Sequence, residues 1–176
     1  MQAVIFLVDT LLGFYQLVLL LRLLLQLVRA DFRNPIARAI VRLTNPVIVP
    51  LRRVLPPAGR LDTASVVAVV LASFVKVAAV LWLSGFGIVP PWYVWLRAVT
   101  IDLARMVLHT YFFAILLYAV LSMVAPGTRS PAQALLASLC EPILSRIRRV
   151  IPPIADLDLS PLWAGIAIQA LLLLLR

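Results

Sequence analysis

Long apolar runs separated by short arginine-rich segments dominate the hydrophobic pattern of the chain. A bilayer core about 30 Å thick requires about 20 residues of helix to cross it, and four apolar windows approach that length. They cover residues 3–28, 64–88, 102–125 and 161–175. Charged residues interrupt them at only a few positions, and the fourth window is short. The pattern predicts an all-α membrane protein with four transmembrane helices.

Composition strengthens this prediction. Hydrophobic residues make up 64% of the 176 residues, whereas soluble domains contain about 45–50%. The 16 Lys and Arg outnumber the 7 Asp and Glu, and the formal net charge is +9. In a soluble chain this excess would suggest nucleic acid. The aromatic residues lie in the apolar runs or on the predicted outer side, away from the arginines, so we expect no nucleic-acid partner.

The arginines also predict an orientation, because cytoplasmic loops carry the excess of positive charge. Seven arginines lie between the first and second windows, and four lie between the third and fourth. The connection between the second and third windows contains Trp92, Tyr93 and Trp95, which suit an interfacial aromatic belt. We therefore expect a multi-pass membrane protein with both termini outside. Its arginine segments would face the anionic lipid head groups on the cytoplasmic side of the membrane.

The sequence repeats itself at an offset of 96 residues without a gap. Apolar matches alone could arise by chance, but a shared R-R-V-x-P-P-x-x-x-L-D pattern could not easily do so. We predict two tandem two-span repeats, residues 1–93 and 94–176, in parallel orientation. The matched polar and proline positions are Pro46 with Pro142, Arg52 with Arg148, Arg53 with Arg149, Pro56 with Pro152, and Asp62 with Asp158.

Each arginine segment has a predictable local structure. Asn34-Pro35 and Ser130-Pro131 place a capping residue before a proline, which predicts the start of a short helix. Ile36, Ile40, Leu43 and Val47 recur at helical spacing, with Arg38 and Arg42 on another face. This pattern is typical of an amphipathic helix lying on a membrane. We expect Pro46 and Pro142 to force a break or a second helix start, and Asp62 and Ser160 to cap the spans that follow.

Two stretches of the chain resemble the YggT family, also called YlmG. They are T-N-P-V-I-V-P-L-R-R-V-L-P-P-A-G-R-L-D at 44–62 and C-E-P-I-L-S-R-I-R-R-V-I-P-P-I-A-D-L-D-L-S-P at 140–161. The resemblance covers nearly the whole chain and is to the duplicated, four-span form. It implies a protein of the bacterial inner membrane. The first copy departs from the family pattern, because Asn45 replaces the usual Glu and Ala64-Ser65 replaces Ser-Pro. The motif positions carried over are Pro46, Pro50, Arg52, Arg53, Pro56 and Asp62, and then Glu141, Pro142, Arg148, Arg149, Pro152, Asp158, Ser160 and Pro161.

The resemblance implies several processes and no established catalytic activity. Bacterial members of the family are linked to osmotic-stress tolerance, cation homeostasis and cell division. Plastid relatives are linked to haem attachment in cytochrome assembly. None of these associations follows from the composition or the spacing of this chain.

The repeated arginine pairs have two open interpretations. They could bind a protein partner or anionic lipid, or they could serve only to keep the loops inside. Topology needs charge without a fixed register, whereas Arg52-Arg53 and Arg148-Arg149 keep the same distance from a proline. This register favours a folded loop with defined contacts. Asp62 and Asp158 are expected to be helix caps or partners of these arginines rather than ion ligands.

Charge inside a membrane is costly and usually faces protein or water, and five of the ionisable residues inside the predicted spans form a candidate cluster. Asp102, Arg105 and His109 share one helix face, and Lys76 is expected to pair with Asp102. Asp9 falls on Arg105 under the repeat, so these two opposite charges are expected at similar depth and could form an ion pair. The cluster could be a structural set of salt bridges or a cation or proton pathway. Both interpretations stay open. The five residues are Asp9, Lys76, Asp102, Arg105 and His109.

The sequence excludes several classes of chemistry. One cysteine, Cys140, permits no internal disulfide, and one histidine, His109, does not make a zinc cluster. No P-loop, Ser-His-Asp set or pair of catalytic carboxylates is visible. We therefore expect no enzyme activity, no cofactor and no metal. Two functions remain, a membrane scaffold or assembly factor and a small cation-handling protein, with a protein partner of unknown identity and a homo-oligomer left open.

Overall fold

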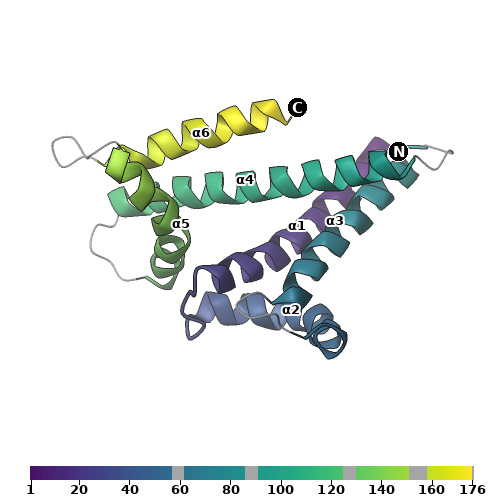
Figure 1. Ribbon diagram of the computed structural model, residues 1–176, viewed down its shortest axis with the longest axis horizontal. Coiled ribbons are helices and arrows are strands. Elements are labelled where there is room, and N and C mark those ends of the chain that lie inside the picture. Colours follow the sequence, from purple (N-terminus) through teal and green to yellow (C-terminus); the bar gives the residue numbers. More distant parts are fainter. Residues whose placement is uncertain (57–61, 86–90, 125–129, 151–157, 176) are drawn as a thin grey trace. The chain divides into compact units, whose positions relative to one another are not determined.

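The computed structural model describes residues 1–56, 62–85, 91–124, 130–150 and 158–175, and within these ranges it contains six helices and no strand (Figure 1). The prediction of an all-α protein is confirmed. The helices are α1 (Gln2–Leu27), α2 (Pro35–Val54), α3 (Thr63–Leu83), α4 (Trp92–Val124), α5 (Pro131–Val150) and α6 (Ser160–Leu174).

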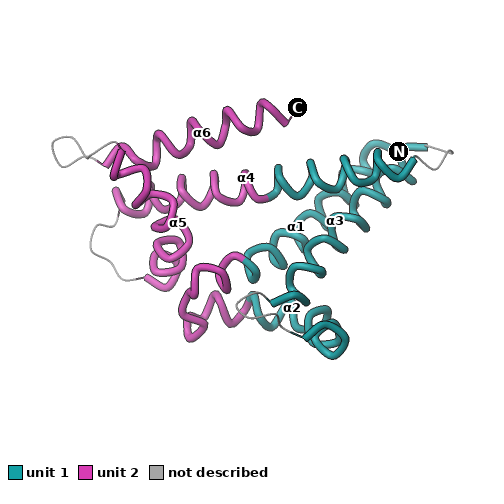
Figure 2. The backbone as a smooth tube through the Cα atoms, in the orientation of Figure 1, with its two compact units in different colours: residues 1–23, 40–106 teal, residues 24–39, 107–176 magenta. Residues whose placement is uncertain are grey.

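The helices form two compact units (Figure 2). Unit 1 comprises residues 1–23 and 40–106, and unit 2 comprises residues 24–39 and 107–176. Three helices, α1, α2 and α4, contribute residues to both units. The predicted repeats 1–93 and 94–176 divide the chain differently and stay a prediction.

Three helices are long and apolar enough to cross a bilayer, namely α1, α3 and α4. Their large apolar side chains lie mostly at the surface, as Phe6, Leu11 and Phe14 illustrate with 65–68% exposure. So much exposed apolar surface suits a lipid environment and not water. The helix α6 is apolar but has only 15 residues, which correspond to about 22 Å of helix.

The second and third predicted spans have different bounds in the structure. The α3 helix ends at Leu83 because Ser84 caps it and Gly85 has a positive φ of 78°, a conformation that glycine adopts at little cost. The α4 helix begins at Trp92, ten residues before the predicted start. Trp92 and Tyr93 in its first turn are 76% and 59% exposed, which suits the aromatic belt expected there.

The proline residues do not break the amphipathic helices, so that expectation was wrong. The α2 helix runs through Pro46 and Pro50, and α5 runs through Pro142. A proline inside a helix costs about 3 kcal/mol, and burial of neighbouring residues offsets this cost. Thr44 and Ile48 in α2 are fully buried, as is Leu144 in α5. Tertiary packing therefore overrides the local preference.

The helix starts in the arginine segments are confirmed. The α2 helix begins at Pro35, where Asn34 Oδ1 accepts a hydrogen bond from the N–H of Ile36 at 2.9 Å. The α5 helix begins at Pro131, where Ser130 Oγ accepts from the N–H of Gln133 at 3.1 Å. Within unit 2, Asn34 Nδ2 also donates to the carbonyl of Pro131 at 2.7 Å. The first turns of the two amphipathic helices are therefore joined.

Candidate functional site

An ion pair joins the end of α2 to the start of α3. Arg52 Nη2 lies 2.6 Å from Asp62 Oδ2, and Arg52 Nε donates to the same oxygen at 3.2 Å. Ser65 Oγ also donates to this oxygen, at 2.7 Å. The Asp62 side chain is 1% exposed, whereas that of Arg52 is 47% exposed. Arg52 therefore ties a basic segment to the span that follows it.

The second arginine segment contains the same ion pair. Arg148 Nε and Nη2 lie 2.9 and 2.8 Å from Asp158 Oδ2. In both pairs the Nε–Nη2 edge of the arginine holds the Oδ2 oxygen of an aspartate ten residues later. Arg148 has a further partner, because its Nη1 donates to Glu141 Oε1 at 2.6 Å. Asn45 occupies the position of Glu141 in the first segment.

Both aspartates have lowered pKa values. Burial raises the pKa of Asp62, but hydrogen bonds from Arg52 and Ser65 outweigh burial and bring it below its ordinary value of 3.8. Burial likewise raises the pKa of Asp158, and hydrogen bonds from Ser160 and Arg148 bring it below 3.8. Both carboxyl groups are therefore ionised at neutral pH, as ion pairing requires.

The expected caps are only partly present. Asp62 is the N-cap residue of α3, but its side chain makes no capping hydrogen bond because Arg52 and Ser65 occupy it. The prediction for Ser160 was wrong, since Leu159 is the N-cap and Ser160 is the first residue of α6. Asp158 Oδ1 accepts from the N–H of Ser160 at 2.9 Å. Pairing with arginine therefore dominates the role of both aspartates.

The second arginine of each pair has a different environment. Arg53 and Arg149 are exposed, and neither forms an ion pair with any residue in the described ranges. An exposed guanidinium can bind phosphate or carboxylate through two parallel hydrogen bonds. Each arginine pair thus divides into one member that binds an aspartate and one that forms no ion pair among the described residues.

The proline positions of the motif lie in several elements. Pro46 and Pro142 lie within α2 and α5, and Pro161 occupies the first turn of α6. The carbonyl of Pro56 accepts a hydrogen bond from Thr63 Oγ1 at 2.8 Å. Pro152 lies outside the described residues.

Arg22 is a site residue that the sequence analysis missed. It is 5% exposed and lies in the last part of α1. Its Nη1 donates to Thr44 Oγ1 at 2.7 Å, to Asn45 Oδ1 at 2.9 Å and to the carbonyl of Val41 at 3.3 Å. The available signal was an arginine inside an apolar run, which must find polar partners. Only the structure identifies those partners.

The corresponding positions in the second segment carry different chemistry. Tyr118 occupies the place of Arg22, and Cys140 the place of Thr44. Cys140 is fully buried. Burial and the neighbouring charge of Glu141 raise the pKa of Cys140 to about 12. The thiol is therefore protonated and unreactive at neutral pH.

A polar cluster lies within unit 1 among the helices that are long and apolar enough to cross a membrane. Lys76 of α3 forms the expected ion pair with Asp102 of α4. Asp102 Oδ2 also accepts hydrogen bonds from Gln16 Nε2 of α1 at 2.9 Å and from Ser73 Oγ at 2.6 Å. Gln16 is fully buried, and its Oε1 has no hydrogen-bond partner among the described residues. One carboxylate thus joins three helices.

The other predicted intramembrane charges do not all join this cluster. Asp9 is exposed on α1, and the expected ion pair with Arg105 does not form among the described residues. Equivalent positions in two repeats can share a depth without facing each other. Arg105 is half-buried and His109 is exposed on α4, and both make other interactions.

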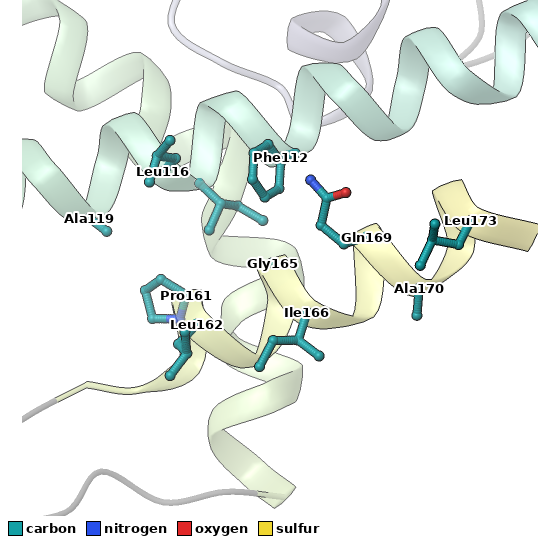
Figure 3. A pocket seen from close by; sticks show the side chains of 11 residues that line it. Phe112, Leu116, Ala119, Pro161, Leu162, Gly165, Ile166, Gln169, Ala170 and Leu173 are labelled. Carbon is teal, nitrogen blue, oxygen red and sulfur yellow. The ribbon is translucent and has the colours of Figure 1, made fainter.

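An apolar groove lies within unit 2 between α4 and α6 (Figure 3). Its volume is about 660 Å³, and Gln169 is the one polar side chain among its lining residues. The figure shows the Gln169 amide directed toward α4, on the side of Phe112. Such a groove accommodates hydrocarbon. Elsewhere in the described ranges, no three His, Cys, Asp or Glu side chains come together as a metal site.

The six helices, three of them able to cross a bilayer, define an all-α membrane protein. The model of the CCB3/YggT family matches residues 1–83 and 97–176, and the chain belongs to this family. The resemblance stated from the motifs is thereby confirmed.

Similar proteins cover nearly the whole chain. It is 39% identical over 171 residues to an uncharacterized protein of Pseudomonas aeruginosa, covering 95% of this chain and 85% of the relative. It is 37% identical over 169 residues to an uncharacterized Vibrio alginolyticus protein from the proC 3′ region, covering 96% of this chain and 91% of the relative. It is 35% identical over 162 residues to the uncharacterized protein YggT of Escherichia coli K12, covering 92% and 83%. No solved structure matches the chain.

Proposed function

We propose that the protein is a scaffold or assembly factor of the bacterial inner membrane. Its two arginine segments would contact anionic head groups and a protein partner on the cytoplasmic side. The observation that supports this proposal is that the two arginines of each pair have different environments. Arg52 and Arg148 bind aspartates, whereas Arg53 and Arg149 are exposed and form no ion pair among the described residues. A topology signal alone would not require this fixed register.

The proposed topology has four spans in two parallel repeats, with α6 as the fourth span. The α2 and α5 helices have 20 residues each, and their bounds are 96 residues apart. The two segments matched by the family model also begin 96 residues apart. Both observations support a duplication. A helix as short as α6 can be accommodated by local thinning of the bilayer or by association with other helices.

The faces of α2 support a position at the membrane surface. Ala37, Thr44 and Ile48 form its buried face. At 3.6 residues per turn, Ile36 and Leu43 lie on a second face and are 40% and 58% exposed. A third face carries exposed arginines, namely Arg38, Arg42 and Arg53. Exposed apolar side chains beside a row of arginines suit the boundary between acyl chains and phosphates.

The proposal assigns no catalysis and no cofactor to the chain. The processes that the family resemblance implies, osmotic-stress tolerance and cell division, are the settings in which such a scaffold would act. A scaffold acts through contacts, so its function should depend on exposed side chains in folded segments. Arg53 and Arg149 meet that requirement on both segments.

Site-specific photocrosslinking in native membranes tests this proposal. A photoreactive amino acid replaces Arg53 or Arg149, and the control carries it at Ser84, which is exposed at the end of α3. We expect discrete protein or phospholipid adducts at 53 and 149 that are absent at 84. If all three positions give the same adducts, the arginine segments have no specific contact and the proposal fails.

The intramembrane cluster supports a second candidate, a role in cation handling. The specific observation is the Lys76–Asp102 ion pair with Gln16 Oε1 unpartnered beside it. Ionisable residues inside membranes often mark ion or proton paths. If Asp102→Asn abolishes salt-dependent growth while the crosslinks at 53 and 149 persist, cation handling becomes the better assignment. Normal salt-dependent growth of Asp102→Asn with the crosslinks at 53 and 149 intact favours the scaffold.

A further inference from the structure

Arg22 is a buried cation without an anionic partner. It is 5% exposed, and its three acceptors, Thr44, Asn45 and the carbonyl of Val41, are all neutral. All three contacts use Nη1, so Nε and Nη2 make no hydrogen bond to any described residue. A guanidinium has five N–H donors and cannot lose its charge in a protein. A buried charge of this kind is unfavourable unless an anion compensates it.

The carboxylate that interacts electrostatically with Arg22 is already occupied. Asp62 interacts with Arg22 at longer range, but its Oδ2 binds Arg52 at 2.6 Å and Ser65 at 2.7 Å. Two arginines therefore share one aspartate, and one positive charge is left over. Arg22 lies five residues before the end of α1 at the arginine-rich side. Long basic side chains at such a position reach toward the head groups.

In the second segment, the equivalent cluster of side chains contains an additional carboxylate. The uncharged Tyr118 replaces Arg22, and the acidic Glu141 replaces Asn45. Glu141 Oε1 accepts from Arg148 Nη1 at 2.6 Å. The second cluster therefore carries one net negative charge, while the first carries one net positive charge. This difference in net charge arises at the two pairs of equivalent positions, 22 with 118 and 45 with 141. It points to an anion from outside the chain that binds at the first site.

We propose that Arg22, Asn45 and Arg52 form a binding site for one phosphate-class anion, either a lipid head-group phosphate or free phosphate. Arg22 contributes its free Nε–Nη2 edge, whose geometry matches two phosphate oxygens. Asn45 Oδ1 accepts from Arg22, so the Asn45 amide group remains a donor. Arg52 adds positive charge. This inference deepens the proposed head-group contact and names a distinct site within the same segment.

The experiment measures phosphate binding by the full-length protein after delipidation in a neutral detergent. The probes are a short-chain phosphatidylglycerol, the matching diacylglycerol without phosphate, and inorganic phosphate. Native mass spectrometry counts bound lipid, and thermal unfolding reports stabilisation by each probe. We expect one tightly bound phosphatidylglycerol per chain and none for diacylglycerol. Stabilisation by inorganic phosphate as well would identify free phosphate as an accepted ligand of the same site.

The test variant is Asn45→Asp, which has nearly the same shape as the wild type and places a carboxylate 2.9 Å from Arg22 Nη1. We expect it to keep or raise the thermal stability and to weaken phosphate binding by about tenfold or more, since it supplies the missing anion. Glu141→Gln is the matched control, and it should bind phosphate as the wild type does. Unchanged binding in Asn45→Asp, or no binding by the wild type, overturns the inference.

Arg22→Gln provides a second variant, because glutamine can still donate to Thr44 or Asn45 without the charge. We expect it to lose phosphate-specific binding. Failure of this inference is distinguishable from failure of the proposed function, since the latter rests on crosslinks at 53 and 149. Wild-type phosphate binding in both Arg22→Gln and Asn45→Asp, with the crosslinks intact, would refute the site and leave the scaffold proposal standing.

Discussion

Arg52 and Asp62 are joined through Nη2 and Oδ2 at 2.6 Å, and the same two atoms of Arg148 and Asp158 lie 2.8 Å apart. In each case ten residues separate the partners, and the pair connects an amphipathic helix to the next apolar helix. The recurrence of one geometry at both places indicates that the register of each arginine pair serves the fold.

The first prediction concerns the energetic coupling of Arg52 and Asp62. Arg52→Gln leaves a carboxylate that is 1% exposed without its cation, so we expect a loss of about 1–2 kcal/mol of stability. The double variant with Asp62→Asn should lose less than the sum of the single losses. Denaturant unfolding in detergent measures all four proteins. Strict additivity would show that the pair contributes no coupling.

Acid should weaken both arginine segments. The folded pKa values of Asp62 and Asp158 lie below their ordinary value of 3.8. The stability from each pair is therefore fully present above the unfolded pKa, and it is lost as the pH falls through the folded pKa. We expect the unfolding temperature to decrease at pH values below about 4. The decrease should be smaller in the double variant Asp62→Asn/Asp158→Asn. Equal acid sensitivity in both proteins would contradict this assignment.

Cys140 should resist modification at neutral pH. It is fully buried, and its pKa of about 12 is three units above the ordinary 9.0, which reduces the thiolate fraction about a thousandfold. Maleimide labelling of native membranes should therefore be slow, and denaturant should make it rapid. Fast labelling before unfolding would show that α5 does not pack as described.

The intramembrane pair of Lys76 and Asp102 should be more damaging to break than to remove. Asp102→Asn leaves a lysine ammonium unpaired among apolar helices, whereas Lys76→Met/Asp102→Asn removes both charges. We expect a lower yield of monodisperse protein for the single variant than for the double variant. Size-exclusion chromatography after expression measures this yield. If the double variant loses as much yield as Lys76→Met and Asp102→Asn lose together, direct coupling of the pair is excluded.

Much of this organisation could be predicted from the sequence, because local rules determine it. The starts of α2 and α5 follow from Asn34-Pro35 and Ser130-Pro131, and the Lys76–Asp102 pair follows from the cost of isolated charge. The continuous helix through Pro46 could not be predicted, since burial of Thr44 and Ile48 compensates for the missing hydrogen bond. The contacts of Arg22 with α2 depend on how α1 and α2 pack, which local pattern does not specify.

The central claim is that Arg53 and Arg149 make the contacts on which function depends, while Arg52 and Arg148 hold the fold. Complementation of a deletion strain under osmotic stress by Arg53→Gln/Arg149→Gln tests it most directly. Cysteine-accessibility labelling in the same cells confirms that expression and orientation are unchanged. The account predicts loss of complementation with normal topology, because the remaining arginines still satisfy the positive-inside rule. Full complementation by this variant would contradict the claim and would leave the arginine pairs with only topological and structural roles.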